Sequence, residues 1–139
     1  MSIEKFKHEV KMIRNMSDIG FAPKLYEHWI DSKSYRVHYG FIVMERMTTT
    51  VKKIILRRDL SSSELKDIKS KIRKLHDNNV KHGDLKPSNI GVHLDERGRI
   101  TVIRMIDWAK GQYTSEQRAY DRDNRTFVEH IEKNIGERK

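Results

Sequence analysis

The segment His-Gly-Asp-Leu-Lys-Pro-Ser-Asn at residues 82–89 constrains the possible fold more than any other part of this chain of 139 residues. Asp84 can accept a proton from a hydroxyl group, and Lys86 can neutralise the charge on a phosphoryl group. Asn89 offers a neutral oxygen of the kind that Mg²⁺ accepts as a ligand. Together these residue types favour phosphoryl transfer, in which catalysis consists mainly of positioning and charge neutralisation.

A second acidic position follows about twenty residues later, in the segment Met-Ile-Asp-Trp-Ala-Lys-Gly that contains Asp107. The residues before it alternate as a strand does, so Asp107 is expected at a strand end. A carboxylate at that place can hold a metal ion that bridges phosphates. Asn89 and Asp107 are therefore the candidate Mg²⁺ ligands.

Composition limits the class of protein. The net charge is +9, which favours polyanionic partners. Nucleic acid is not expected as the main partner, because no basic motif with interleaved aromatic residues and no zinc-finger spacing occurs. Without cysteine there can be no disulfides. No apolar run is long enough to span a membrane and no leader pattern opens the chain, so we expect a soluble, cytoplasmic protein of one domain with no membrane contact.

Periodicity predicts an α+β fold. Ser61 and Glu64 form a capping-box pattern at the start of the clearest helix, and Gly98 is expected to take a positive φ in a hairpin turn. Phe127 and Ile135 are expected on one apolar helix face. Helices are predicted over 3–17, within 48–60, over 61–79 and from 118 onward, strands over 24–30, 38–47, 90–94 and 101–107, and turns at 31–34 and 95–99.

The polar motifs also resemble those of a known superfamily. Residues 82–89 resemble the H-R-D-L-K-P-x-N signature of protein kinases, with Gly83 in place of the usual arginine, and residues 106–111 resemble the D-F-G element. The resemblance implies ATP and Mg²⁺ as cofactors. It implies that Asp84 is the catalytic base, that Lys86 contacts phosphate, that Asn89 and Asp107 hold Mg²⁺, and that His82 packs under the loop.

The remaining segments fit the same resemblance. Residues 6–13 resemble helix C, with Glu9 as the residue that normally pairs with a lysine on strand three. Residues 41–47 resemble strand five and the hinge, which places Met44 as gatekeeper and Glu45 to Met47 against adenine. The last helix resembles helix F, in which Asp123 would be the buried acid that holds the catalytic loop.

The resemblance implies a reduced kinase-like fold, with an N-lobe remnant and hinge at 1–47 and a minimal C-lobe at 48–139. No glycine-rich loop and no strand-three lysine occur, and the part after Asp107 is short, as in RIO-like kinases. The pattern resembles a truncated Ser/Thr kinase of the compact kind found in large DNA viruses. Gly91 stands where a large apolar residue usually lies under adenine, so a thinned adenine floor is expected.

Three functions remain open at this point. The first is a Ser/Thr protein kinase-like enzyme, active alone or completed by another chain. The second is a pseudokinase that binds a protein partner, either a host kinase that it regulates or a second copy of itself in a homodimer. The third is a small-molecule phosphotransferase, because "HGD" followed by "IDW" also occurs in aminoglycoside and choline phosphotransferases.

Overall fold

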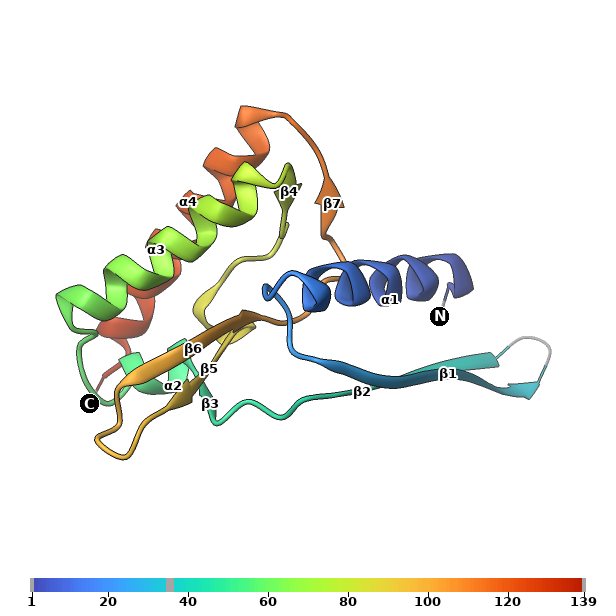
Figure 1. The fold of residues 1–139 in the computed structure, drawn as a ribbon, viewed down its shortest axis with the longest axis horizontal. Helices are drawn as coiled ribbons and strands as arrows, with labels where there is room; N and C mark the ends of the chain where they lie inside the picture. Colours follow the sequence, from blue (N-terminus) through green and yellow to red (C-terminus); the bar gives the residue numbers. More distant parts are fainter. Residues whose placement is uncertain (1, 35–36, 139) are drawn as a thin grey trace.

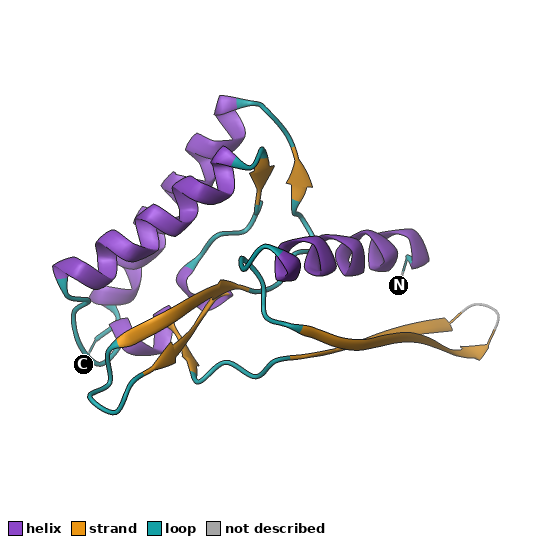
Figure 2. Cartoon of the chain, viewed as in Figure 1, coloured by secondary structure: helices purple, strands orange, loops and turns teal. Residues whose placement is uncertain are grey.

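The structure is a computed structural model that describes residues 2–34 and 37–138 (Figures 1 and 2). Helices and short antiparallel sheets alternate along the chain, which is the α+β arrangement expected from the sequence. The elements in order are α1 (Ile3–Asp18), β1 (Leu25–Ser34), β2 (Val37–Met44), β3 (Thr49–Thr50), α2 (Val51–Ile55), α3 (Ser62–Asp77), β4 (Val80–Lys81), the 3₁₀ turn η1 (Pro87–Asn89), β5 (Ile90–Leu94), β6 (Ile100–Met105), β7 (Gln112–Tyr113) and α4 (Gln117–Gly136).

Three antiparallel sheets organise the strands. The long hairpin β1–β2 forms one sheet, the order β3-β5-β6 forms the second, and the short strands β4 and β7 form the third. Figure 1 shows α1 lying along the hairpin at one end of the molecule, while α3 and α4 lie together at the other end. The polar loop 82–89 connects β4 to β5 and therefore lies where these two halves meet.

Local sequence explains the main helices. The α1 helix starts at Ser2, whose hydroxyl accepts a hydrogen bond from the Lys5 amide. At α3 the capping box is present in both directions, because the Ser61 hydroxyl accepts from the Glu64 amide and the Glu64 carboxylate accepts from the Ser61 amide. Ile68 of α3 is fully buried, so its apolar stripe faces the core.

One cluster of buried apolar side chains runs through the molecule. It joins Met16 of α1, Leu75 of α3, Val92 of β5 and Phe127 of α4, and it includes Trp108. Trp108 is fully buried, and its indole N–H donates to the Met105 carbonyl oxygen at 2.7 Å. Trp108 thereby anchors the chain in the core directly after the metal-ligand candidate Asp107. Within residues 2–34 and 37–138, no helix combines the length and the apolar character needed to cross a membrane.

Several sequence expectations needed correction. The predicted turn at 31–34 is wrong, because β1 continues through Ser34 and these residues pair with β2. Ile135 was expected on the apolar face of α4, but it is 43% exposed, and Asn134 is buried in its place. The two-residue strands β3, β4 and β7 were not predicted, since segments this short carry no periodicity of their own. The turn at 95–99 is confirmed, with φ of 78° at Gly98.

Candidate functional site

The loop 82–89 is supported from below by His82. This side chain is fully buried, and its Nε2 donates to the Ile106 carbonyl oxygen at 2.8 Å. Its Nδ1 accepts from the Asp84 amide at 3.2 Å, and its ring packs edge-on against Trp108. Burial lowers the pKa of His82 below its ordinary value, so the neutral ring, with one donor and one acceptor nitrogen, fits this place.

Asp123 of α4 anchors the same loop from the other side. Its two carboxylate oxygens accept hydrogen bonds from the backbone N–H groups of His82 at 2.9 Å and Gly83 at 3.0 Å. A third bond comes from the His76 ring at 2.9 Å. Burial alone would raise the pKa of Asp123, but the hydrogen bonds from His76, His82 and Gly83 outweigh it, and the pKa lies below its ordinary value. The carboxylate is therefore charged, and both of its oxygens accept hydrogen bonds from the protein.

The three polar residues of the loop lie together. The Asn89 amide N–H group donates to both the Asp84 carbonyl oxygen at 2.9 Å and the Asp84 Oδ2 at 3.2 Å. The Lys86 ammonium lies 3.9 Å from the same Oδ2. Both Asp84 and Lys86 are partly exposed, with side-chain exposures of 29% and 41%. A carboxylate held from one side by an amide and a cation is left open to solvent, and hence to a substrate, on the other.

Asp107 lies two residues after the end of β6, and its segment is joined to the loop through the backbone. The Ile106 N–H donates to the Asn89 carbonyl oxygen at 2.8 Å, which places the two metal-ligand candidates on neighbouring chain segments. Asp107 has φ of 58°, a left-handed conformation uncommon for residues other than glycine. Such conformations persist only where the surrounding structure fixes them. Here the buried Trp108 on one side and the bond from Ile106 on the other fix it.

A cleft of about 590 Å³ opens beside these residues, between α1, the end of β2, β3 and the ends of β5 and β6. This volume falls in the range of small-molecule sites. Glu9 and Asp107 both line it. Burial raises the pKa of Glu9, and the charge of Asp107 raises it further, so these two acids lie close enough in the cleft to repel each other. The residues that line the cleft are Glu9, Ile42, Met44, Glu45, Arg46, Met47, Thr48, Thr49, Thr50, Lys53, Gly91, Ile106 and Asp107.

The hinge candidates Glu45 and Met47 lie in the wall of this cleft, but the Glu45 side chain is held by protein groups. Its carboxylate accepts from the Lys24 amide at 3.2 Å and from the His93 ring at 2.8 Å. The hydrogen bond from His93, followed by the one from Lys24, lowers the pKa of Glu45. His93 in turn bonds Thr48 at 3.1 Å. This network ties the hinge segment to β5. The Glu45 N–H also donates to the Lys24 carbonyl oxygen at 2.8 Å, so of this residue's polar groups only the backbone carbonyl oxygen is left for a ligand.

Met47 fills the space next to Gly91. Gly91 is buried, and a Cβ atom added to it would lie 2.6 Å from the Met47 Cγ. The methionine side chain therefore fills the space that a larger residue at position 91 would occupy. A side chain at position 91 would collide with Met47, so the glycine makes room for the methionine.

The donor set at the cleft suits a magnesium ion. The Asn89 amide N–H group is turned toward Asp84, so its oxygen points away from Asp84 and can serve as a ligand. Asp107 supplies a carboxylate, and Mg²⁺ binds proteins through one or two such groups while keeping water and phosphate oxygens. Throughout the described residues, no group of three or more His, Cys, Asp or Glu side chains is placed to hold a metal ion.

Sequence comparison assigns the family. The model of the lipopolysaccharide kinase (Kdo/WaaP) family matches residues 1–134. The chain belongs to this family. Its fold is kinase-like, because it matches a chain of the yeast RNA Pol II CTD kinase CTDK-1 complex with a TM-score of 0.60 and 18% identity, over 81% of this chain and 36% of that one.

Two curated relatives are protein kinases by name. The meiosis induction protein kinase IME2/SME1 of Saccharomyces cerevisiae is 34% identical over 86 residues, or 59% of this chain and 13% of the yeast protein. The probable serine/threonine-protein kinase FPV226 of fowlpox virus is 29% identical over 97 residues, or 67% of this chain and 32% of the viral protein. The chain thus spans less than a third of the length of either relative.

Two features of the site were missed from the sequence. His76 was expected to be a surface or packing residue, yet it is buried, bonds Asp123 and stacks on Tyr120. His93 was also given no role, although it holds Glu45. Neither contact leaves a local signal, because the partners are separated by 47 and 48 residues.

Proposed function

We propose that this protein transfers a phosphoryl group from ATP to a serine or threonine hydroxyl of a protein substrate. The observation that carries the proposal is the arrangement at Asp84, whose carboxylate is contacted by Asn89 and Lys86 on one side and remains open on the other. The kinase names of the two curated relatives support a hydroxyl acceptor on a protein.

In this proposal Asp84 is the general base. A substrate hydroxyl placed at the open side of its carboxylate would give up its proton to the carboxylate as the oxygen attacks the terminal phosphorus of ATP. The bond from that phosphorus to the bridging oxygen breaks, and ADP leaves. Lys86 would meet the transferring phosphoryl group, because its ammonium lies on the same side of the loop as the Asp84 carboxylate.

The nucleotide would lie in the cleft between the hinge and Asp107. Met47 would supply the apolar surface under adenine, and the backbone of the hinge would bond its edge. Asn89 and Asp107 would hold Mg²⁺, which, when bound, neutralises charge on the phosphates. Because the contacts are largely electrostatic and open to solvent, we expect weak binding of Mg-ATP, with Kd near or above roughly 0.1 mM, or about 5–6 kcal/mol.

A sugar hydroxyl is the second candidate acceptor. The observation that favours it is the family itself, whose description is that of a lipopolysaccharide kinase. Chemically the step would be the same, since Asp84 accepts a proton from any hydroxyl that reaches it. The acceptor must therefore be decided by experiment and not by the composition of the catalytic loop.

Transfer of labelled phosphate from ATP tests the proposal. Serine- and threonine-containing protein and a sugar acceptor should be offered separately, with wild-type protein and the variants Asp84→Asn and Asp107→Ala. We expect transfer to protein that falls about 10²–10⁴-fold in Asp84→Asn, the usual contribution of a general base. Asp121→Asn is the matched control, because Asp121 is an exposed acid on α4.

The outcomes separate the alternatives. Transfer to the sugar but not to protein would replace the proposed acceptor and keep the mechanism. Wild-type turnover no higher than that of Asp84→Asn would refute phosphotransfer and leave the pseudokinase hypothesis, in which the protein acts by binding a partner. A rise in melting temperature with Mg-ATP that is lost in Asp107→Ala would then still report nucleotide binding.

A further inference from the structure

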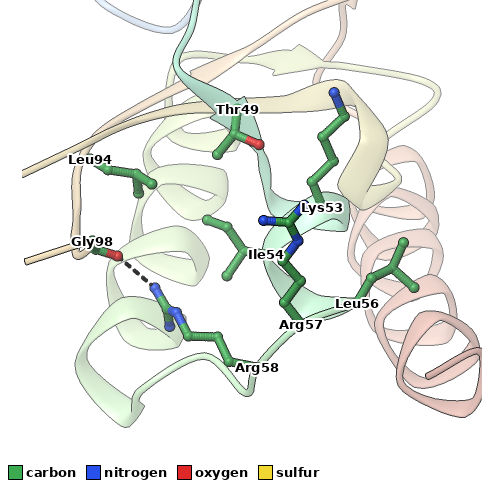
Figure 3. Close-up of a pocket in the computed structure, with 8 residues that line it drawn as sticks. All are labelled: Thr49, Lys53, Ile54, Leu56, Arg57, Arg58, Leu94 and Gly98. Atoms are coloured by element: carbon green, nitrogen blue, oxygen red, sulfur yellow. Dashed lines mark hydrogen bonds between the residues drawn. The ribbon is translucent and has the colours of Figure 1, made fainter. Parts of the chain in front are cut away.

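A second hollow of about 630 Å³ adjoins the nucleotide cleft and shares Thr49 and Lys53 with it (Figure 3). It is bounded by α2, by the start of β3 and by the turn between β5 and β6. We call it the α2 groove. The side chains that matter for the argument are Lys53, Ile54, Leu56, Arg57, Arg58 and Leu94.

The floor of the α2 groove is apolar and partly open. Ile54 is buried, Leu94 is half-buried, and Leu56 is 36% exposed. Figure 3 shows these three side chains around the same hollow, with Ile54 between the other two. An apolar side chain from outside could therefore lie against Leu56 and Leu94 and bury surface that now faces water, which is favourable by about 25 cal/mol per Å².

The rim of the α2 groove is basic, but its cations differ in availability. The Arg58 guanidinium is already occupied, since it bonds both carboxylate oxygens of Glu64 at 2.8 and 3.0 Å and the Gly98 carbonyl oxygen at 2.9 Å. Arg58 therefore forms part of the groove wall, and most of its N–H donors are not available to a ligand. Lys53 and Arg57 are exposed, and neither forms an ion pair with any residue that the structure describes. They are the two cations that a ligand can use.

Two acidic residues near the groove, Glu64 and Asp95, are held by protein groups. Glu64 is buried beneath Arg58 and also accepts from the Ile100 amide. Asp95 accepts from the turn amides of Arg97 and Arg99. Among the described residues, none of those that line the groove is acidic. The local charge is therefore positive, and an anionic ligand would meet no repelling carboxylate at its walls.

We propose that the α2 groove binds an acidic linear segment of a partner protein. Its carboxylates would pair with Lys53 and Arg57, and an apolar side chain such as leucine would lie against Leu56 and Leu94. A peptide fits better than a nucleic acid, because the described residues that line the groove include no aromatic side chain on which a base could stack. This inference does not depend on phosphotransfer, since binding at the groove needs neither ATP nor Asp84.

Fluorescence anisotropy of a labelled synthetic peptide, with acidic residues flanking a central leucine, tests the inference in the absence of ATP. We expect saturable binding that weakens about 10-fold or more in the double variant Lys53→Glu with Arg57→Glu. Leu56→Ala should weaken it as well, without a change in charge. The same peptide with the leucine replaced by serine should bind as poorly to wild type as the original peptide binds to Leu56→Ala.

The matched control is Lys66→Glu with Lys69→Glu, which changes the net charge equally on an exposed face of α3 that shares no lining residue with the α2 groove. Equal loss in the control and in the groove variant would overturn the proposal, because binding would then follow net charge alone. Absence of saturable peptide binding would also overturn it. So would a single-stranded oligonucleotide that binds more tightly than the peptide and displaces it. Melting temperatures of all variants would verify that they are folded.

Discussion

Replacement of Asp123 by asparagine should damage the protein far more than its small change in shape suggests. Both carboxylate oxygens accept backbone hydrogen bonds, one from His82 and one from Gly83. Asparagine keeps one oxygen and replaces the other with an NH₂ group, which is a donor. Whichever way the amide is turned, one backbone N–H of the catalytic loop would face another donor.

The expected cost follows from these contacts. An unsatisfied buried donor costs about 1–3 kcal/mol, and the remaining bonds lose the assistance of the negative charge, which adds about 1 kcal/mol. The side chain of Asp123 is only 2% exposed, so water cannot replace the lost partners. We therefore expect Asp123→Asn to lower the free energy of unfolding by about 2–4 kcal/mol, a large share of the stability of a small domain.

Urea denaturation of wild type and variant at neutral pH measures this loss, with Asp121→Asn as the control. Asp121 lies on the same helix, is exposed and accepts only from Gln117 within the described residues, so its replacement should cost less than about 0.5 kcal/mol. The stabilising effect of the Asp123 charge is present above its unfolded pKa of 3.8 and is lost as the pH falls through the lowered folded value. The difference between wild type and Asp123→Asn should shrink accordingly in acid. A loss below about 1 kcal/mol at neutral pH would refute the reasoning.

Three further results are expected. The hydrogen bond from Arg58 lowers the pKa of Glu64 to about 2. The stability that the charged Glu64 contributes should therefore be present above pH 4.5 and be lost as the pH falls toward 2. In acid denaturation, the free energy of unfolding of Glu64→Gln should depend less on pH over that window than that of wild type. Burial and, to a smaller extent, the charge of Asp107 raise the pKa of Glu9, so Glu9→Gln should stabilise the Mg²⁺-free protein at neutral pH. In thermal melting, the difference in melting temperature between Glu9→Gln and wild type should shrink as the pH falls through the raised pKa. Gly91→Ala should push a Cβ atom into the Met47 side chain and weaken the rise in melting temperature that Mg-ATP causes. An unchanged rise would contradict the proposal that Met47 lies under adenine.

The helices could be predicted because their information is local. The apolar spacing of α1 and the capping box of α3 lie within a few residues of each other, and both helices are where the sequence placed them. The β5–β6 hairpin was predictable for the same reason, since its turn contains Gly98. The end of β1 was not predictable, because Asp31, Ser32 and Ser34 are polar residues that enter the strand only through pairing with β2.

The residue types of the candidate site could be read from the sequence, but the way they are supported could not. Asp84 and Asn89 are separated by five residues, and their contact follows from the tight loop between them. Met47 and Gly91 are far apart in the chain, and their packing against each other could not be predicted from either residue alone. From the sequence, a glycine at position 91 indicates an unfilled space. The structure shows that the Met47 side chain occupies that space.

Gly83 shows how one residue connects the candidate catalytic loop with the segment after Asp107. The sequence comparison with kinases treats it as the loss of an arginine. In the structure Gly83 has φ of 88°, and a Cβ added to it would lie 2.6 Å from the Lys110 carbonyl oxygen. No larger residue fits there, because the segment after Asp107 crosses directly over the loop. The same segment is tied to α1 by the His8 ring, which donates to the Gly111 carbonyl oxygen at 2.6 Å. The glycine therefore allows the segment after Asp107 to pack directly against the loop 82–89, and the bond from His8 ties the same segment to α1. These contacts are made without the arginine.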